Sequence, residues 1–375
     1  MRHVKALIPS IVTGVMGNSV IYLIPLLVGG MVSDRGFSEQ QAGFMASAEL
    51  GGYALATLLT ALLLDRVPWQ RMAFAGLVAM IAANVATTFA HDGQTFALVR
   101  IASGLGSGIL AALASVAIGQ TDQPDRNYGF LIAASLLYGT AALWGLPVLL
   151  ARYGLNSAYW LLVALAVAVI FVVPSMPAGR AARNERSAAV GVSGRWLLSA
   201  AVLLSILLFW ADQNDVYAYI ERIGNASGIS EEFIGFSLGV ANLTGFAGAS
   251  LVAALGTRFG RLLPMLFATV INLVCLVILA QAVRPWTYLV ALGAMAVSWN
   301  VVNPFQLGIL AGVDPTGRAL ALAATVTGAG LAVGPAIGAI AVGIGGYVAV
   351  LWAAGALAVF SLVLMLPELR VVRAS

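Results

Sequence analysis

The stretch GFSEQQAGFMASAELGGYALATLLTALLLDR, residues 36–66, returns in altered form as GISEEFIGFSLGVANLTGFAGASLVAALGTR, residues 228–258. The two copies align without gaps at an offset of 192 residues, and nine of their 31 positions are identical. In each copy a serine, Ser38 or Ser230, can cap a helix N-terminus, and the acidic residue after it favours the positive end of the helix dipole. The repeat predicts a chain built from two similar halves.

The composition places both halves in a membrane. Of the 375 residues, 61% are hydrophobic and 9% are charged, and the mean hydropathy is +0.97, which excludes an ordinary soluble domain. Apolar runs of about 20 residues recur along the chain, and each can cross the hydrocarbon as a helix. The runs are continuous rather than alternating, so they indicate helices and not a β-barrel. The run at 6–32 is too long for a cleaved signal peptide and predicts the first spanning helix.

The apolar runs predict an all-α membrane protein with twelve spanning helices in two six-helix bundles. The expected helices are 6–32, 40–64, 71–89, 95–118, 128–150, 157–174, 196–220, 230–256, 262–282, 286–312, 319–342 and 346–366. The polar stretch 177–195 is expected to be a cytoplasmic linker between an N-terminal bundle, 1–176, and a C-terminal bundle, 196–375.

Lysine and arginine set the expected orientation. Fourteen of them lie on the side that holds both termini and four lie on the other side, which predicts cytoplasmic termini and a multi-pass protein of the inner (cytoplasmic) membrane. The net charge of +4 comes from these short loops, so we expect no nucleic-acid partner.

Four ionisable residues interrupt the apolar runs: Glu49, Arg100, Asp212 and Asp215. A charge at the centre of a spanning helix costs about 2.5–3.5 kcal/mol on insertion scales. Such groups persist where they face a bundle interior or a watery path, which indicates a transporter.

The organisation resembles the major facilitator superfamily over essentially the whole chain. The first signature is the loop after the second expected helix, where Asp65, Arg66 and the displaced Arg71 fit the family pattern and both of its glycines are lost, to Ala61 and Pro68. The second copy of the loop carries Arg258 and Arg261 without the acid. In the family this loop stabilises one gate conformation, so the resemblance implies a gating role for these residues.

The second signature lies in the fourth expected helix and the third in the eleventh. Arg100 with Gly104, Gly106 and Gly108 is similar to a family pattern associated with proton coupling, and small residues also let membrane helices approach closely. Gly330, Gly334, Pro335 and Gly338 resemble an element that family antiporters carry in helix five. The alternative for this second glycine set is a packing groove with a proline kink.

Polar residues concentrate in helices one, four, seven and ten, which line the central cavity in the family. The resemblance and the chemistry of these side chains predict a substrate-binding set of Asn18, Tyr22, Arg100, Ser103, Trp210, Asp215, Tyr219, Trp299, Asn300 and Asn303. Asn300 and Asn303 share a helix face that can form a hydrogen-bonding wall, or a purely structural contact between helices. The aromatic residues can stack on an aromatic or cationic solute, or sit at the membrane interface.

Asp212 and Asp215 share a helix face, and two nearby carboxyl groups in a low dielectric resist ionising together. One of them is therefore expected to exchange protons, unless both lie solvated at the outer helix end with Glu221. Glu49 is expected to be a second protonation site or the partner of Arg100. Arg100 is expected to bind an anionic substrate group or to tune an acid. The proton-coupling set is Glu49, Arg100, Asp212 and Asp215.

These features predict a secondary active transporter that exports a small amphipathic organic solute by proton coupling and alternating access. The alternatives are proton-coupled uptake of a small organic acid and, in another class, a non-transporting receptor or a channel. The two histidines, His3 and His91, are terminal or in a loop, and no phosphate-binding loop with lysine occurs, so no enzyme is expected. The expected partners are a small-molecule substrate, protons and the lipid bilayer. We expect a monomer with no cofactor and no metal.

Overall fold

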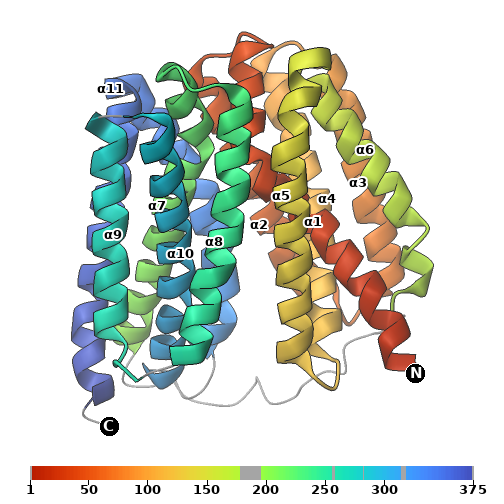
Figure 1. Cartoon of the computed structure of the whole chain (residues 1–375). Helices are drawn as coiled ribbons and strands as arrows, with labels where there is room; N and C mark the ends of the chain where they lie inside the picture. The colour runs from red at the N-terminus through yellow and green to blue at the C-terminus, as the bar shows by residue number, and fades with distance from the viewer. Residues whose placement is uncertain (1, 178–195, 256–257, 282, 314–317, 374–375) are drawn as a thin grey trace. The chain divides into compact units, whose positions relative to one another are not determined.

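The computed structural model describes residues 2–177, 196–255, 258–281, 283–313 and 318–373, and every regular element in these ranges is helical. The chain divides into two compact units, Met1–Arg183 and Asn184–Ser375. In the first unit the elements are α1 (Arg2–Ser33), α2 (Glu39–Leu63), α3 (Trp69–Phe89), α4 (Gly93–Gly119), α5 (Pro124–Tyr153), α6 (Asn156–Ile170) and the 3₁₀ turn η1 (Val173–Ser175). In the second they are α7 (Trp196–Ala226), α8 (Glu231–Leu255), α9 (Leu262–Gln281), α10 (Pro285–Val313) and α11 (Arg318–Arg373) (Figure 1).

Ten helices of the described residues are long and apolar enough to cross a membrane, and α6 is a shorter apolar helix. The prediction of an all-helical membrane protein is confirmed. The number of twelve spans stays a prediction, as does the domain division at 176 and 196. The predicted linker at 177–195 lies outside the described residues except for residue 177.

The long helix α11 covers the two helices expected at 319–342 and 346–366. It is interrupted at Gly345 (φ −147°, ψ 23°) and Gly346 (φ 66°, ψ −161°), whose backbones are not helical. Gly346 lies 192 residues after Gly154 (φ 69°), which ends α5. The same spacing separates Gly36 (φ 69°) from Gly228 (φ 79°), ahead of α2 and α8. Positive φ favours glycine, so these four positions show that the sequence repeat is also a repeat of backbone geometry.

The helix N-termini of the repeat form as expected. Ser38 and Gln41 make a reciprocal capping box at α2, and the Ser230 hydroxyl accepts a 3.4 Å hydrogen bond from the backbone N–H of Phe233 in α8. Several expected boundaries are wrong by four residues or more. The first helix begins at Arg2 rather than 6, the fifth at Pro124 rather than 128, and the last continues to Arg373 rather than ending at 366. The sixth helix ends at Ile170 rather than 174, because Pro174 cannot donate a backbone hydrogen bond to the carbonyl of Ile170. The seventh helix continues to Ala226 rather than ending at 220.

The first unit is built around a close approach of α2 and α4. A Cβ atom added to Gly104 would overlap the carbonyl oxygen of Glu49, and one added to Gly108 would overlap that of Tyr53. Gly52 of α2 faces the carbonyl of Ile101 in the same way. Only glycine permits this backbone contact, and it brings the side chains of α2 and α4 within reach of each other.

Candidate functional site

The first unit contains a buried ion pair. Arg100 of α4 is 1% exposed and Glu49 of α2 is 3% exposed. The Arg100 guanidinium donates two parallel hydrogen bonds to the Glu49 carboxylate, from Nε to Oε2 at 3.1 Å and from Nη2 to Oε1. Two-point contacts of this kind are the strongest geometry for an arginine–carboxylate pair. The predicted partnership of Glu49 and Arg100 is therefore present in the structure.

The remaining donors of Arg100 are also occupied. Nη1 donates to Asn84 Oδ1 at 3.0 Å and to Thr87 Oγ1 at 3.1 Å, both from α3, and Nη2 donates to Ser103 Oγ at 2.9 Å. A guanidinium has five N–H donors, and these contacts account for all five. Its Cζ atom lies 4.8 Å from the centroid of the Tyr159 ring of α6. The cation therefore ties together four helices of the unit and has no donor left for a substrate anion.

A second set of polar side chains in the first unit is half-buried. The Tyr53 hydroxyl of α2 donates to Asn18 Oδ1 of α1 at 2.9 Å, and Tyr22 of α1 and Tyr138 of α5 are also half-buried. Asn18 and Tyr22 belong to the predicted substrate-binding set. Tyr53 and Tyr138 were not predicted, because an isolated tyrosine in an apolar run gives no signal until another helix supplies its partner. The set carries no formal charge.

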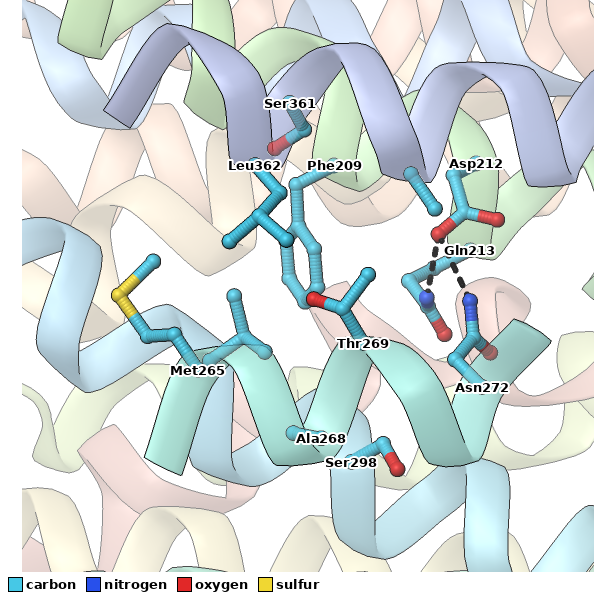
Figure 2. Close-up of a pocket in the computed structure, with 12 residues that line it drawn as sticks. Phe209, Asp212, Gln213, Met265, Ala268, Thr269, Asn272, Ser298, Ser361 and Leu362 are labelled. Carbon is cyan, nitrogen blue, oxygen red and sulfur yellow. Dashed lines mark hydrogen bonds between the residues drawn. The ribbon is translucent and has the colours of Figure 1, made fainter. Parts of the chain in front are cut away.

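In the second unit, Asp212 lies in the middle of α7, 16 residues after its first residue and 14 before its last. It is 1% exposed, and its Oδ2 accepts hydrogen bonds from Gln213 Nε2 at 2.7 Å and from Asn272 Nδ2 of α9 at 3.2 Å (Figure 2). Oδ1 has no partner among the described residues. The mid-helix position argues against the alternative that this acid lies solvated at the helix end.

Asp212 lines a small pocket in the second unit. Figure 2 shows its walls, which come from α7, α9, α10 and the second part of α11. Beside Asp212 and Asn272, its polar lining comprises Gln213, Thr269, Ser298 and Ser361. The Asp212 carboxyl is thus held by neutral amides beside a small pocket with both polar and apolar lining.

Asp215 differs from Asp212. It is 0% exposed, and neither of its carboxyl oxygens has a hydrogen-bond partner among the described residues. One of these oxygens lies against Gly338 of α11. The two acids thus share α7 but face different surroundings: Asp212 accepts hydrogen bonds from two amides, and Asp215 lies in the contact with α11 without a hydrogen-bond donor among the described residues.

Three aromatic residues of the second unit come together as an aromatic cluster. The rings of Trp210 (α7) and Trp299 (α10) meet edge to face with centroids 5.3 Å apart, and Tyr217 meets Trp299 at 6.4 Å. All three are half-buried. Tyr219 is not in this cluster, because it is fully buried beside Gly338. Asn300 and Asn303 are half-buried on α10, and Asn300 Nδ2 donates to the carbonyl of Ala296 in its own helix at 2.9 Å.

The predicted gating residues lie at helix ends. Asp65 and Arg66 are exposed in the turn after α2, Arg71 is exposed in the first turn of α3, and Arg258 is exposed before α9. Arg261 is half-buried and approaches Gly308 of α10. Within the described residues no ion pair joins Asp65 to the nearby arginines. Their gating role stays a prediction.

The predicted glycines of α11 contact α7. Added Cβ atoms at Gly330 and Gly334 would overlap the backbone of α7, and one at Gly338 would overlap a side chain of the same helix. Pro335 lies between them inside the helix, where its missing N–H leaves the carbonyl of Leu331 without its helical donor. These contacts fit the alternative of a packing groove, and a role of this element in antiport stays a prediction.

Comparisons with known proteins agree with this architecture. A family model described as the Major Facilitator Superfamily matches residues 10–316. A variant of the peptide transporter POT, crystallised with alafosfalin, has a TM-score of 0.79 at 14% identity, covering 98% of this chain and 95% of that one. The nucleoside transporter NupG gives 0.76 at 12% identity, with 99% of each chain covered, and the xylose transporter XylE from E. coli gives 0.74 at 13%, with 97% of each covered. No curated protein sequence matches the chain significantly.

At these identities the solved structures establish the shared fold, and the family match covers most of the chain. Together they indicate a multi-pass membrane transporter rather than an enzyme. The helical architecture, the repeat with its glycine turns and the family match lead to one conclusion: the chain belongs to the Major Facilitator Superfamily.

Proposed function

We propose that the chain is a secondary active transporter that works by alternating access and exports a small amphipathic organic solute in exchange for protons. The observation that carries the proton coupling is the contrast between the two units. In the first unit the buried acid Glu49 is paired with the buried base Arg100. In the second, Asp212 and Asp215 are buried on α7, and no arginine or lysine is paired with either among the described residues.

A buried carboxylate without a cation or enough donors is costly, whereas a neutral carboxyl group is tolerated. No donor among the described residues reaches the Asp215 carboxyl, so its surroundings favour the protonated acid in this conformation. Asp212 keeps two amide donors and an adjoining small pocket, which support either form. We therefore assign proton exchange to α7, with Asp215 as the principal proton carrier. Glu49 is assigned a structural role as the ion-pair partner of Arg100.

The proposed solute class rests on half-buried aromatic and amide side chains of the candidate site. In the first unit this set comprises Asn18, Tyr22, Tyr53 and Tyr138, and in the second it comprises Trp210, Tyr217, Trp299, Asn300 and Asn303. All are neutral, and they offer aromatic faces and hydrogen bonds. Such surfaces suit an amphipathic solute with an aromatic part. Uptake of an organic acid gripped by Arg100 has less support, because all five donors of that guanidinium are occupied.

Transport into inside-out vesicles tests this proposal. Vesicles that contain the full chain are energised with an acidic interior, and uptake of the aromatic dye Hoechst 33342 is compared with uptake of benzoate. We expect dye uptake that collapses when a protonophore is added, and no benzoate uptake. Asp215→Asn is expected to abolish gradient-driven accumulation, while downhill exchange of the dye persists. Gradient-driven accumulation by both Asp212→Asn and Asp215→Asn at the level of the unaltered protein would refute the assignment.

A further inference from the structure

The neighbour of Asp215 in α11 is a glycine whose missing side chain leaves space for the carboxyl group. A Cβ atom built on Gly338 would overlap Asp215 Oδ1 and would lie 2.7 Å from Cε2 and 3.0 Å from Cδ2 of the Tyr219 ring. The Asp215 carboxyl and the edge of the Tyr219 ring therefore fill the recess above the Gly338 backbone. We call this space the Gly338 recess.

The two preceding glycines of α11 contact different atoms. A Cβ on Gly330 would lie 2.7 Å from the carbonyl oxygen of Leu207, and one on Gly334 would lie 2.6 Å from that of Ala211 and 2.8 Å from the backbone nitrogen of Asp215. These two glycines set the distance between the α7 and α11 backbones. Of the three, Gly338 alone meets the carboxyl group itself.

The internal repeat shows that this pair is specific to the second unit. At the repeat offset of 192 residues, the positions that correspond to Asp215 and Gly338 are Leu23 of α1 and Leu146 of α5. Both leucines are buried, at 0% and 1% exposure. Where the first unit has two large apolar side chains, the second has an acid and a glycine. Ordinary packing between two helices does not require an acid opposite a glycine, whereas a recess that holds a carboxyl group does.

The Gly338 recess offers little to an anion. Its floor is helical backbone whose N–H is used within α11, and its wall is an aromatic ring edge. Residues 328–346 of α11 include no titratable side chain. The other titratable groups of α7 are Asp212, Tyr217, Tyr219, Glu221 and Arg222, and the neighbouring α9 and α10 add Cys275 and Tyr288. Arg222 is the one cation in this set, and it lies seven residues beyond Asp215, about 10 Å along the helix axis. Neither carboxyl oxygen of Asp215 has a hydrogen-bond partner among the described residues, so Arg222 does not pair with it in this structure.

We propose that Gly338 is a positioning residue for Asp215, which fits the Gly338 recess as a neutral acid and must leave it when ionised. Protonation then closes α11 onto α7, and proton release loosens that contact. This inference rests on the proposed function in naming Asp215 as the proton carrier, and it adds the helix contact through which the proton acts.

The test is the thermal unfolding of the purified full chain between pH 4 and pH 9. A protonated carboxyl in the recess contributes stability that is present at low pH and lost as the pH rises. The unaltered protein should therefore show a downward step in its unfolding temperature, and Asp215→Asn should remove the step. Gly338→Ala should abolish the step or move its midpoint to a lower pH, where the proton concentration is at least tenfold higher. The reason is that the added methyl group excludes the carboxyl from the recess.

Gly334→Ala is the matched control, since it crowds the same helix contact without touching a carboxyl oxygen. It should lower the unfolding temperature at every pH and leave the midpoint of the step unchanged. If Gly338→Ala keeps the midpoint of the unaltered protein, or Gly334→Ala shifts it equally, the recess is packing alone and the inference is wrong. The inference also fails if Asp215→Asn retains the step.

Hydrogen exchange provides a second readout if Gly338→Ala does not fold. After correction for the intrinsic effect of pH, peptides from 207–219 and 328–340 should exchange faster above the midpoint in the unaltered protein and not in Asp215→Asn. Equal exchange in the two proteins would overturn the inference. Transport separates it from the proposed function: a normal step without gradient-driven dye transport refutes the function alone, whereas proton-driven transport with an unshifted Gly338→Ala midpoint refutes the recess alone.

Discussion

Arg100 and Glu49 form a two-point ion pair at the centre of the first unit, with neither side chain more than 4% exposed. Asn84, Thr87 and Ser103 accept the hydrogen bonds that the carboxylate does not. Burying two charges is favourable only when the geometry is good and the remaining donors are satisfied, and both conditions hold here. The ion pair therefore has a structural role in the first unit, in contrast to Asp212 and Asp215 of α7.

Removing one charge of this ion pair should strongly lower the stability of the protein. Arg100→Gln leaves Glu49 as a buried charge without a cation and should lower the free energy of unfolding by about 3–5 kcal/mol. Reversible unfolding in mixed micelles measures this loss. The double variant Glu49→Gln with Arg100→Gln should recover part of it, because no uncompensated charge remains. A double variant whose loss equals the sum of the two single losses would show that the side chains do not act as a pair.

Two adjacent glycines of α2 should respond oppositely to alanine. Gly52→Ala places a methyl group against the carbonyl of Ile101 and should cost about 1–3 kcal/mol of stability, because α2 and α4 must separate. Gly51 has no atom within 4 Å of its Cβ position, so Gly51→Ala should be neutral or should stabilise the helix by up to about 1 kcal/mol. The same unfolding measurement compares them. Similar losses in both variants would show that α2 and α4 do not pack as described.

The hydrogen bond from Asn272 to Asp212 gives a prediction about the stability of the second unit. Asn272→Leu removes one of the two amide donors and should cost about 1–3 kcal/mol, because a buried polar group loses its partner. The double variant Asp212→Leu with Asn272→Leu replaces both partners by apolar side chains of similar size and should be closer to the unaltered protein in stability. Additive losses would contradict a direct contact between the two side chains.

The helix cap at Asp92 predicts a simple pH dependence. The backbone N–H of Thr95 donates to the Asp92 carboxylate at 2.8 Å, and this hydrogen bond lowers the pKa of the Asp92 carboxyl below its ordinary value of 3.8. A lowered pKa contributes stability that is present above the ordinary value and is lost as the pH falls through the folded-state value. Asp92→Ala should lower the unfolding temperature at neutral pH, and the difference should shrink below pH 3.8.

Asp92→Asn is the control for that prediction. Asparagine caps helices about as well as aspartate, so this variant should unfold near the temperature of the unaltered protein at neutral pH. A difference between Asp92→Ala and the unaltered protein that persists unchanged in acid would show that the carboxylate charge contributes nothing to the cap.

Much of the architecture could be predicted from the sequence, because the signals are local. A run of about 20 apolar residues must satisfy its backbone polar groups internally, so it forms a helix. Ser38 and Gly36 predict a helix start and a turn from their own chemistry, and the constant offset of 192 residues shows where the pattern recurs. The predicted end of the sixth helix at 174 follows the apolar run and is wrong because Pro174 cannot donate to the carbonyl of Ile170. The predicted end of the seventh helix at 220 is six residues short of Ala226.

The surroundings of the candidate site residues could be predicted less well than the helices. The unusual groups can be recognised from the sequence, since an acid or arginine within an apolar run must have a reason to remain there. Which reason applies depends on how the helices pack in three dimensions. This packing places Glu49 beside Arg100 from another helix, gives Asp212 its amides, and sets Asp215 against Gly338, 123 residues further along the chain. The state of a buried charge depends on donors and space supplied by distant segments, and no local pattern encodes them.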